Sequence, residues 1–279
     1  METNVIYCMD NVEGLRTHIP DNSIDLTVTS PPYDDLRDYK EYEWDFKKLA
    51  EELYRITKEG GVVVWVVGDK TVNGSETLSS FKQAIYFKEK VGFNHHDTMI
   101  YRKQNNLPKN DPRYENVFEY MFILSKGKPK TFNPIKIDCK MAGEELRGKQ
   151  RKKNGKLVKT HKYKGKIKDK KVQPNIWSYP VGYGRTTKDD FAFEHPALFP
   201  EKLAKDHIKS WSNKGDMVLD PFMGGGTTAK MAELLNRKWI GFEISQEYVD
   251  IAYKRVGKLD KRYYEKLPEK KKPKQAQLF

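Results

Sequence analysis

Two short segments of this 279-residue chain combine reactive side chains with loops that could hold them in place. The first, Ser30-Pro31-Pro32-Tyr33, ends an apolar run and offers a hydroxyl, a rigid Pro-Pro backbone and an aromatic ring. The second, residues 218–227 (VLDPFMGGGT), places an acid at the end of an apolar run, just before a run of glycines. Ligands of open α/β sheets bind in loops that follow the carboxyl ends of strands. The sequence therefore predicts one site built from both loops.

A further acid follows the glycine loop at a spacing that suits a nucleoside. Glu243 stands 23 positions after Asp220, again at the end of an apolar run. An acid about 20 residues beyond a glycine-rich turn is typical of ribose binding. The full Gly-x-Gly-x-x-Gly pattern is absent here, as is the Gly-Lys-Ser/Thr of a phosphate-cradling loop. The pattern indicates a nucleoside-containing ligand and argues against a nucleoside triphosphate.

Together these motifs resemble those of the amino-methylating DNA methyltransferases that use S-adenosylmethionine. The resemblance covers residues 3–257 apart from a middle insert, and the catalytic loop precedes the cofactor loop, as in the β-type permuted order of that family. S-adenosylmethionine carries no phosphate, so a phosphate-binding motif is not needed. The resemblance implies S-adenosylhomocysteine as the product and no metal. His95 and His96 form an isolated pair, to which we assign no metal.

The expected cofactor site combines residues of the strand ends and of the helix that follows the glycines. Asp220, the glycines and a helix N-terminus could meet the charged groups of the cofactor. By resemblance, Glu243 holds the ribose hydroxyls, Asp10 lies near the adenine amino group, and the backbone of His195–Pro200 covers the methionine end. The full predicted set is Asp10, Asp220, Pro221, Phe222, Met223, Gly224, Gly226, Thr227, Thr228, Glu243 and Ile244.

The expected catalytic residues are Ser30, Pro31, Pro32 and Tyr33. An exocyclic amine is a poor nucleophile because its lone pair is delocalised into the base. The Ser30 hydroxyl and the Pro31 carbonyl could accept its two protons, and Tyr33 could stack on a base flipped out of the duplex. Within the family, a serine in the place of Ser30 favours the N4 amine of cytosine, while the N6 amine of adenine stays open. The alternative is that the tetrapeptide is only a turn.

Alternating strand and helix patterns predict an α/β fold with a doubly wound, mostly parallel sheet. By resemblance this is a Rossmann-like methyltransferase fold with permuted motif order and a basic target-recognition insert. The predicted strands are 4–9, 25–29, 62–67, 98–102, 118–125, 217–220 and 239–243, and the predicted helices are 11–18, 46–57, 77–90, 200–211, 228–236 and 246–255.

The positive charge of the chain is concentrated in one segment. Residues 126–171 hold 18 Lys or Arg and four acids, a net charge of +14, whereas the whole chain carries +13. A basic segment favours a polyanion such as double-stranded DNA, and a solvated lysine-rich loop is the alternative. The predicted DNA contacts are Lys149, Arg151, Lys152, Lys153, Lys162, Lys164 and Arg185.

These patterns predict four segments: a catalytic half (1–125), the basic insert (126–180), a cofactor-binding half (181–257) and a disordered basic tail (258–279). No stretch approaches the about 20 apolar residues that cross a bilayer, and we expect no signal peptide. Two cysteines cannot form a disulfide framework, and Cys8 is expected to be buried. We therefore expect a cytoplasmic protein of bacterial, archaeal or phage origin.

The motifs leave several readings of the function open. The favoured one is site-specific cytosine-N4 methylation of DNA, and a homodimer and a cognate restriction endonuclease are partners that the resemblance allows. Adenine-N6 methylation is the alternative on the same scaffold. A nucleic-acid-binding protein without catalysis, or an RNA or protein methyltransferase, fits the motifs less well.

Overall fold

The computed structural model describes residues 1–32, 44–105, 113–145, 149–159 and 166–257. These fall into two compact units, one made of Met1–Phe132 and the chain from Ile176 onward, the other of Asn133–Asn175. The smaller unit thus lies within the predicted insert of residues 126–180. Tyr33, Lys162, Lys164 and the predicted tail lie outside the described residues.

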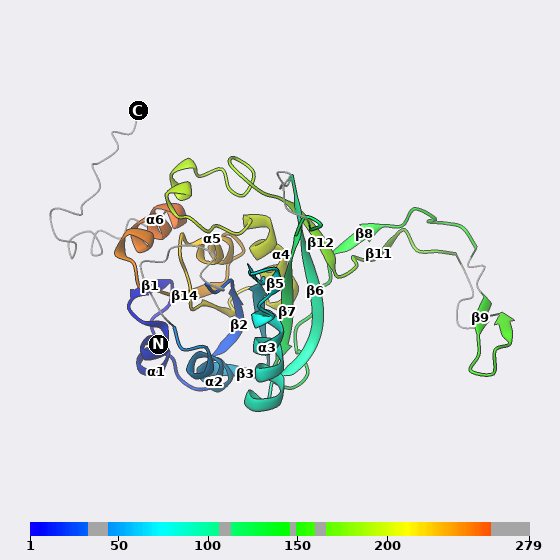
Figure 1. Cartoon of the computed structure of the whole chain (residues 1–279), viewed down its shortest axis with the longest axis horizontal. Coiled ribbons are helices and arrows are strands. Elements are labelled where there is room, and N and C mark those ends of the chain that lie inside the picture. Colours follow the sequence, from blue (N-terminus) through cyan, green and yellow to red (C-terminus); the bar gives the residue numbers. More distant parts are fainter. Residues whose placement is uncertain (33–43, 106–112, 146–148, 160–165, 258–279) are drawn as a thin grey trace. The chain divides into compact units, whose positions relative to one another are not determined.

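An eight-stranded sheet forms the centre of the larger unit (Figure 1), in the order β1-β14-β13-β2-β3-β7-β6-β12. Of these eight strands, only β7 runs against the others. The predicted doubly wound, mostly parallel α/β fold is confirmed. The strands are β1 (Val5–Cys8), β2 (Ile24–Thr29), β3 (Thr57–Val67), β6 (Asn94–Gln104), β7 (Phe118–Ser125), β12 (Ile176–Pro180), β13 (Met217–Asp220) and β14 (Lys238–Glu243).

The strand order reverses between β13 and β2. From β13 the next strand of the chain, β14, lies on one side, whereas from β2 the next strand, β3, lies on the other. Loops that leave such a switch point in opposite directions open a crevice at the carboxyl ends of the strands. Asp220 ends β13 and Thr29 ends β2, so the two predicted loops begin on either side of this crevice.

Helices cover both faces of the sheet. One layer contains α1 (Asn11–His18), α2 (Phe46–Ile56) and α3 (Ser79–Tyr86), which continues into a π-helical turn, η1 (Phe87–Val91). The other contains α4 (Glu201–Trp211), α5 (Thr227–Leu234) and α6 (Gln246–Val256). Figure 1 shows α1–α3 below the strands and α4–α6 above them. Short elements complete the unit: β4 (Thr71–Val72), β5 (Ser75–Glu76) and a 3-10 turn, η2 (Asp190–Glu194).

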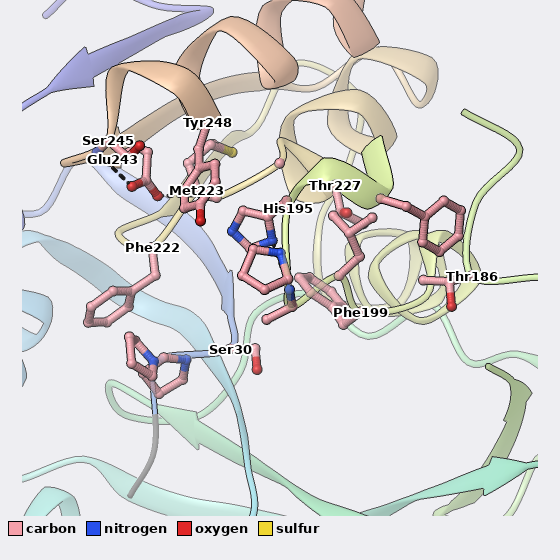
Figure 2. A pocket seen from close by; sticks show the side chains of 18 of the residues that line it. Ser30, Thr186, His195, Phe199, Phe222, Met223, Thr227, Glu243, Ser245 and Tyr248 are labelled. Atoms are coloured by element: carbon pink, nitrogen blue, oxygen red, sulfur yellow. Dashed lines mark hydrogen bonds between the residues drawn. The ribbon is translucent and has the colours of Figure 1, made fainter. Parts of the chain in front are cut away.

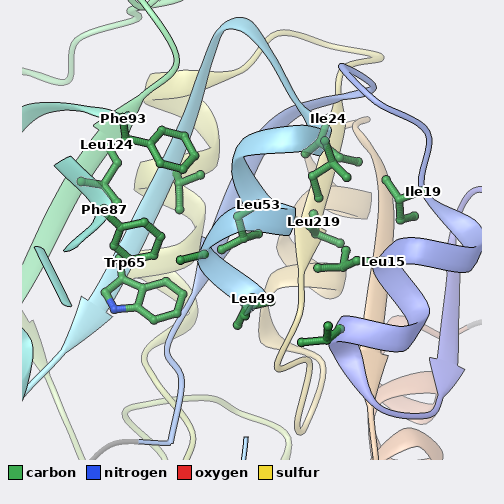
Figure 3. Packing of buried hydrophobic residues seen from close by; sticks show 14 of the residues in the cluster. Leu15, Ile19, Ile24, Leu49, Leu53, Trp65, Phe87, Phe93, Leu124 and Leu219 are labelled. Carbon is green, nitrogen blue, oxygen red and sulfur yellow. The ribbon is translucent and has the colours of Figure 1, made fainter. Parts of the chain in front are cut away.

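The core explains why the strands read as continuous apolar runs. Val62–Val67 of β3 are each at most 1% exposed, because helices pack on both faces of the sheet. Figure 3 shows Trp65, Phe87 and Phe93 in contact on one side of the cluster and Leu15, Ile24 and Leu219 gathered on the other. Burial of such large side chains contributes about 1.5–3 kcal/mol each.

One helix end differs by a residue from its prediction, and one local expectation was wrong. Helix α2 ends at Ile56, one residue before the predicted end at Thr57, because Thr57 turns to extended backbone and its hydroxyl donates to the Leu53 carbonyl. Cys8 is exposed instead of buried, because β1 is an edge strand of the sheet and Cys8 is its last residue.

The smaller unit consists of two-stranded antiparallel ribbons. β8 (Lys136–Asp138) pairs with β11 (Lys170–Val172), and β9 (Lys149–Arg151) pairs with β10 (Leu157–Lys159). The β9–β10 turn carries the exposed side chains of Lys152 and Lys153. No helix is present among the described residues of this unit.

Candidate functional site

A cleft of about 1120 Å³ opens at the carboxyl edge of the sheet in the larger unit. Its walls come from the ends of β2, β6, β13 and β14, from the start of the reversed strand β7, and from the segment 181–199. Figure 2 shows Ser30 on one side of this cleft, Glu243 and Ser245 on another, and His195 between them. The two predicted loops therefore face one space.

The Asp220 carboxylate joins these two loops from beneath the cleft. It is 1% exposed and is not among the residues that line the cleft. Its Oδ1 accepts hydrogen bonds from the Thr29 hydroxyl (2.7 Å) and from the Phe222 amide (3.0 Å). Thr29 immediately precedes Ser30, so one buried carboxylate fixes the start of the catalytic loop relative to the cofactor loop.

Burial also changes the acidity of Asp220. Loss of water raises its pKa to about 7, although the Thr29 and Thr228 hydroxyls and the Phe222 amide act in the opposite direction. Its Oδ2 has no hydrogen-bond partner among the described residues. The Thr228 hydroxyl, which is close in sequence, donates to the Val28 carbonyl at 3.1 Å.

Glu243 presents its carboxylate to the cleft on fixed backbone bonds (Figure 2). The Gly224 amide donates to Oε2 at 2.8 Å and the Ser245 amide donates to Oε1 at 2.9 Å. Burial raises the pKa of this carboxyl above its usual value, and the amide bonds offset only part of that rise. The side chain is thus held rigidly at the end of β14, with its remaining lone pairs available to a ligand in the cleft.

The glycine turn lets two other segments approach closely. Gly224 has a φ of +48°, and a Cβ there would lie 2.8 Å from Nε2 of His195. At Gly225 a Cβ would lie 2.7 Å from Leu198, and at Gly226 it would lie 2.6 Å from Ala252 of α6. The glycines therefore make room for α6 and for residues 181–199, which we call the covering segment.

A charged network holds the covering segment in place. The guanidinium of Arg255, which is fully buried, donates to the Gly225 carbonyl (2.6 Å) and the Thr227 hydroxyl (2.9 Å). It also pairs with Asp189 (3.0 Å) and Glu201 (2.8 Å). Lys230 pairs with the same two acids at 2.6 and 2.8 Å. Burial opposes ionisation of both acids, but bonds from the two cations outweigh it and lower their pKa values.

Most of the predicted site residues line the cleft, and some do not. Those that line it are Ser30, Pro31, Pro32, Pro221, Phe222, Met223, Gly224, Thr227, Glu243 and Ile244. Asp220, Gly226 and Thr228 lie behind its wall. The Asp10 side chain caps α1 by accepting from the Glu13 amide, and its neighbours Met9 and Asn11 line the cleft instead.

The predicted DNA contacts are divided between the two units. Lys149, Arg151, Lys152 and Lys153 belong to β9 and the turn after it, in the smaller unit. Arg185 is exposed in the larger unit, in a turn next to the cleft residues Tyr183 and Thr186.

Sequence reasoning missed one wall of the cleft. This wall is formed by Tyr101 and Lys103 near the end of β6 and by Glu119 near the start of β7. Both strands lie beyond β3, on the side of β2 away from β13. The available signal was a charged residue within or next to each predicted strand, Glu119 inside 118–125 and Lys103 one position after 98–102, but nothing local tells that β7 runs in reverse. Tyr183, Thr186 and Phe193 were missed for a similar reason, since their segment has no regular pattern.

Two features are absent from the described part of the chain. No group of three or more His, Cys, Asp or Glu side chains there could hold a metal ion. None of the described helices is long and apolar enough to cross a membrane.

The sequence matches one family model and several curated relatives. The family model described as an N6/N4 DNA methylase matches residues 24–254. The orphan methyltransferase M.BamHII of Bacillus amyloliquefaciens is 58% identical over 87% of this chain and 92% of its own length. The Type II methyltransferase M.BglII of Bacillus subtilis is 31% identical over 90% of this chain and 68% of its own length.

Solved structures share the fold. The PvuII DNA methyltransferase, named as cytosine-N4-specific, is 24% identical with a TM-score of 0.67, over 91% of this chain and 86% of its own. M1.HpyAVI in complex with S-adenosylmethionine is 25% identical with a TM-score of 0.57, over 90% of this chain and 98% of its own.

The sheet order and the cleft at its switch point define a Rossmann-like methyltransferase fold. The chain belongs to the N6/N4 DNA methylase family. The family predicted from the two loops is therefore confirmed, together with S-adenosylmethionine as the cofactor of this DNA methyltransferase.

The raised pKa of Asp220 predicts a distinct pH dependence of stability. The folded state holds this proton more tightly than the unfolded state, so stability falls as the pH rises from about 4 to about 7 and is constant above that. A shift of about three pKa units corresponds to at most about 4 kcal/mol. In Asp220→Asn this component should vanish, because the amide does not ionise.

Urea unfolding of both proteins at several pH values between 5 and 8 measures the difference. Asp138→Asn is the control, since that side chain is 89% exposed. A constant difference in unfolding free energy between the wild type and Asp220→Asn across this range would show that Asp220 ionises normally.

Proposed function

We propose that the chain methylates the N4 amine of cytosine within a short sequence of duplex DNA. The observation that carries the proposal is that Ser30-Pro31 lines the same cleft as Glu243 and the glycine turn. A base amine held at Ser30 would thus be within one cavity with the cofactor. The serine in this position favours cytosine, and so does the similarity to the PvuII methyltransferase, which is named as cytosine-N4-specific. Adenine N6 methylation is the second candidate, because the matching family includes both activities.

The cleft fits the cofactor by its donor set. Glu243 would accept from the ribose hydroxyls, and Phe222 would lie against the adenine. The Thr227 hydroxyl and the N-terminus of α5 offer donors for a carboxylate. When bound, the cofactor supplies a methyl group on a positively charged sulfur. Asp220 would act as a positioning residue through Thr29 and Phe222, and Asp10 and Thr228 would contribute at most through their neighbours.

The catalytic loop, which begins with Ser30-Pro31-Pro32, would position the amine and would not deprotonate it beforehand. In the transfer the sulfur–methyl bond would break as the nitrogen–carbon bond forms, S-adenosylhomocysteine would leave, and one amine proton would pass to water. The Ser30 hydroxyl and the Pro31 carbonyl would accept hydrogen bonds from the amine and aim its lone pair at the methyl group. Pro32 limits the loop to few conformations, and positioning of this kind supplies up to about 7–11 kcal/mol.

A target amine inside a duplex is out of reach of this cleft, so the base must be flipped out. Tyr33 is the proposed stacking platform for it. The ribbons of the smaller unit are the proposed target-recognition region, with Lys149, Arg151, Lys152, Lys153, Lys162 and Lys164 as phosphate or base contacts and Arg185 as a contact from the larger unit.

The assembly of the enzyme is a separate proposal. A homodimer and a cognate restriction endonuclease both fit the family, but M.BamHII is named an orphan methyltransferase whereas M.BglII is named a Type II methyltransferase. The higher identity to M.BamHII favours a chain that acts without a dedicated endonuclease.

Expression in a bacterial host without N4 or N6 methylation tests the proposed function. Host DNA is digested to nucleosides and analysed by mass spectrometry, and sequencing with detection of modified bases gives the target sequence. N4-methylcytosine is the expected product. N6-methyladenine would replace the favoured function by the second candidate, and absence of both would overturn the proposal.

Removal of the Ser30 hydroxyl should slow transfer without affecting the cofactor. Ser30→Ala loses one acceptor for the amine, a bond felt most in the transition state, and the single-turnover rate should fall about 5- to 150-fold. Calorimetry should give unchanged affinity for S-adenosylmethionine. Ser75→Ala, at an exposed serine of the β4–β5 hairpin, is the matched control. Wild-type turnover in Ser30→Ala would mean that the loop is only a turn.

Neutralising the β9–β10 turn should weaken DNA binding in a salt-dependent way. The triple variant Arg151→Ala, Lys152→Ala, Lys153→Ala removes three exposed cations. If each meets a phosphate, the slope of log affinity against log salt should become shallower by about 3. Fluorescence anisotropy at several salt concentrations measures the slope, and cofactor affinity should not change. An unaltered slope would assign this turn a structural role.

A further inference from the structure

We propose that Lys103 is a specificity-determining residue that donates hydrogen bonds to the ring acceptors of the flipped base, and that Glu119 positions its ammonium. This inference rests on the proposed function, because it requires an extruded base in the cleft. It concerns the wall of the cleft that sequence reasoning missed.

Both side chains belong to the same cleft as Ser30. The Lys103 ammonium lies 2.5 Å from Oε1 of Glu119, and the two side chains are 31% and 11% exposed. Lys103 is the second-last residue of β6, and its amide donates to the Val117 carbonyl at 2.7 Å. Glu119 lies opposite Tyr101 in the β6–β7 register.

The reversal of β7 is what brings this pair to the site. Because β7 runs against its neighbours, its first residues lie at the carboxyl edge of the sheet, where β2 also ends. Glu119 near the start of β7 and Lys103 near the end of β6 therefore meet at the cleft that the catalytic loop also lines. In a fully parallel sheet Glu119 would lie at the opposite edge.

The cleft contains few cations that could meet a base. Among the described residues that line it, Lys103 is the only Lys or Arg. Holding two strands together does not require such a pair, because apolar side chains of similar size do this as well or better at a partly buried site. The Glu119 side chain, only 11% exposed, instead holds the Lys103 ammonium at the wall of the cleft.

The chemistry of the base edge indicates what the ammonium would contact. Next to its N4 amine, cytosine carries the acceptors N3 and O2 side by side. Next to its N6 amine, adenine carries the acceptor N1 and then a C–H group. An ammonium has three donors and no acceptor, so it can serve both cytosine acceptors but only one of adenine. Adenine in the same place would leave one ammonium donor facing a C–H group and not an acceptor, so Lys103 would add to the preference for cytosine.

The test compares Lys103→Met and Glu119→Gln with the wild-type chain on three duplexes. One carries the target base found by sequencing, the second carries adenine in its place (or cytosine, if the target is adenine), and the third carries an abasic site there. The abasic duplex keeps the phosphates but offers no base to contact. Lys82→Met, an exposed lysine of α3 outside the cleft, is the control.

For Lys103→Met we expect a single-turnover rate about 10- to 100-fold lower on the target duplex and weaker binding to that duplex. Affinity for the abasic duplex and for S-adenosylmethionine should equal that of the wild type. Glu119→Gln should show a smaller loss in the same direction. The preference for cytosine over adenine at the target position should narrow in both variants.

Three results would overturn the inference. An equal loss of affinity for the abasic duplex would make Lys103 a phosphate contact, and lowered cofactor affinity would make the pair structural. Wild-type rates in both variants would make it a strand contact only. The nucleoside product of the wild-type chain, measured in parallel, tests the proposed function separately. If that product were N6-methyladenine, the abasic comparison would still report whether Lys103 touches the flipped base.

Discussion

The site depends on one buried carboxylate at the switch point of the sheet. Asp220 accepts from Thr29 on one strand and from Phe222 on the loop of the next, so the two loops of the cleft share a single anchor. Burying this group is costly, as its raised pKa shows. The cost is compatible with a stable fold because the surrounding strands are buried on both faces.

The only regular element of the covering segment is the 3-10 turn η2, and ion pairs hold the segment in place. Arg255 and Lys230 both pair with Asp189 and Glu201. Asp189 immediately precedes the 3-10 turn, and Glu201 is the first residue of α4. Since Arg255 also donates to the Gly225 carbonyl, the same side chain fixes the segment and the glycine turn. The glycines complete this arrangement by leaving space for His195 and Leu198. Helix α6 thus stabilises two segments that are distant from it in the sequence.

Local signals in the sequence were sufficient for most of the fold. Alternation of apolar runs with amphipathic stretches located the strands and helices because both faces of a parallel sheet are buried, so each strand reads as one apolar run. Helix ends were less certain: α2 stops at Thr57 through a side-chain bond to Leu53, whereas the glycines that follow lie inside β3. The exposure of Cys8 also depended on a tertiary fact, the edge position of β1.

The sequence by itself determined the family, the sheet class and the two loops of the site, because each loop is encoded in consecutive residues after a strand. Tertiary structure alone decided that Asp220 lies behind the cleft wall, that the glycines face a covering segment, and that Lys103 and Glu119 meet at its edge. These contacts join residues that are distant in the chain. Strand order and the reversed direction of β7 create them, and neither leaves a mark on any short stretch of sequence.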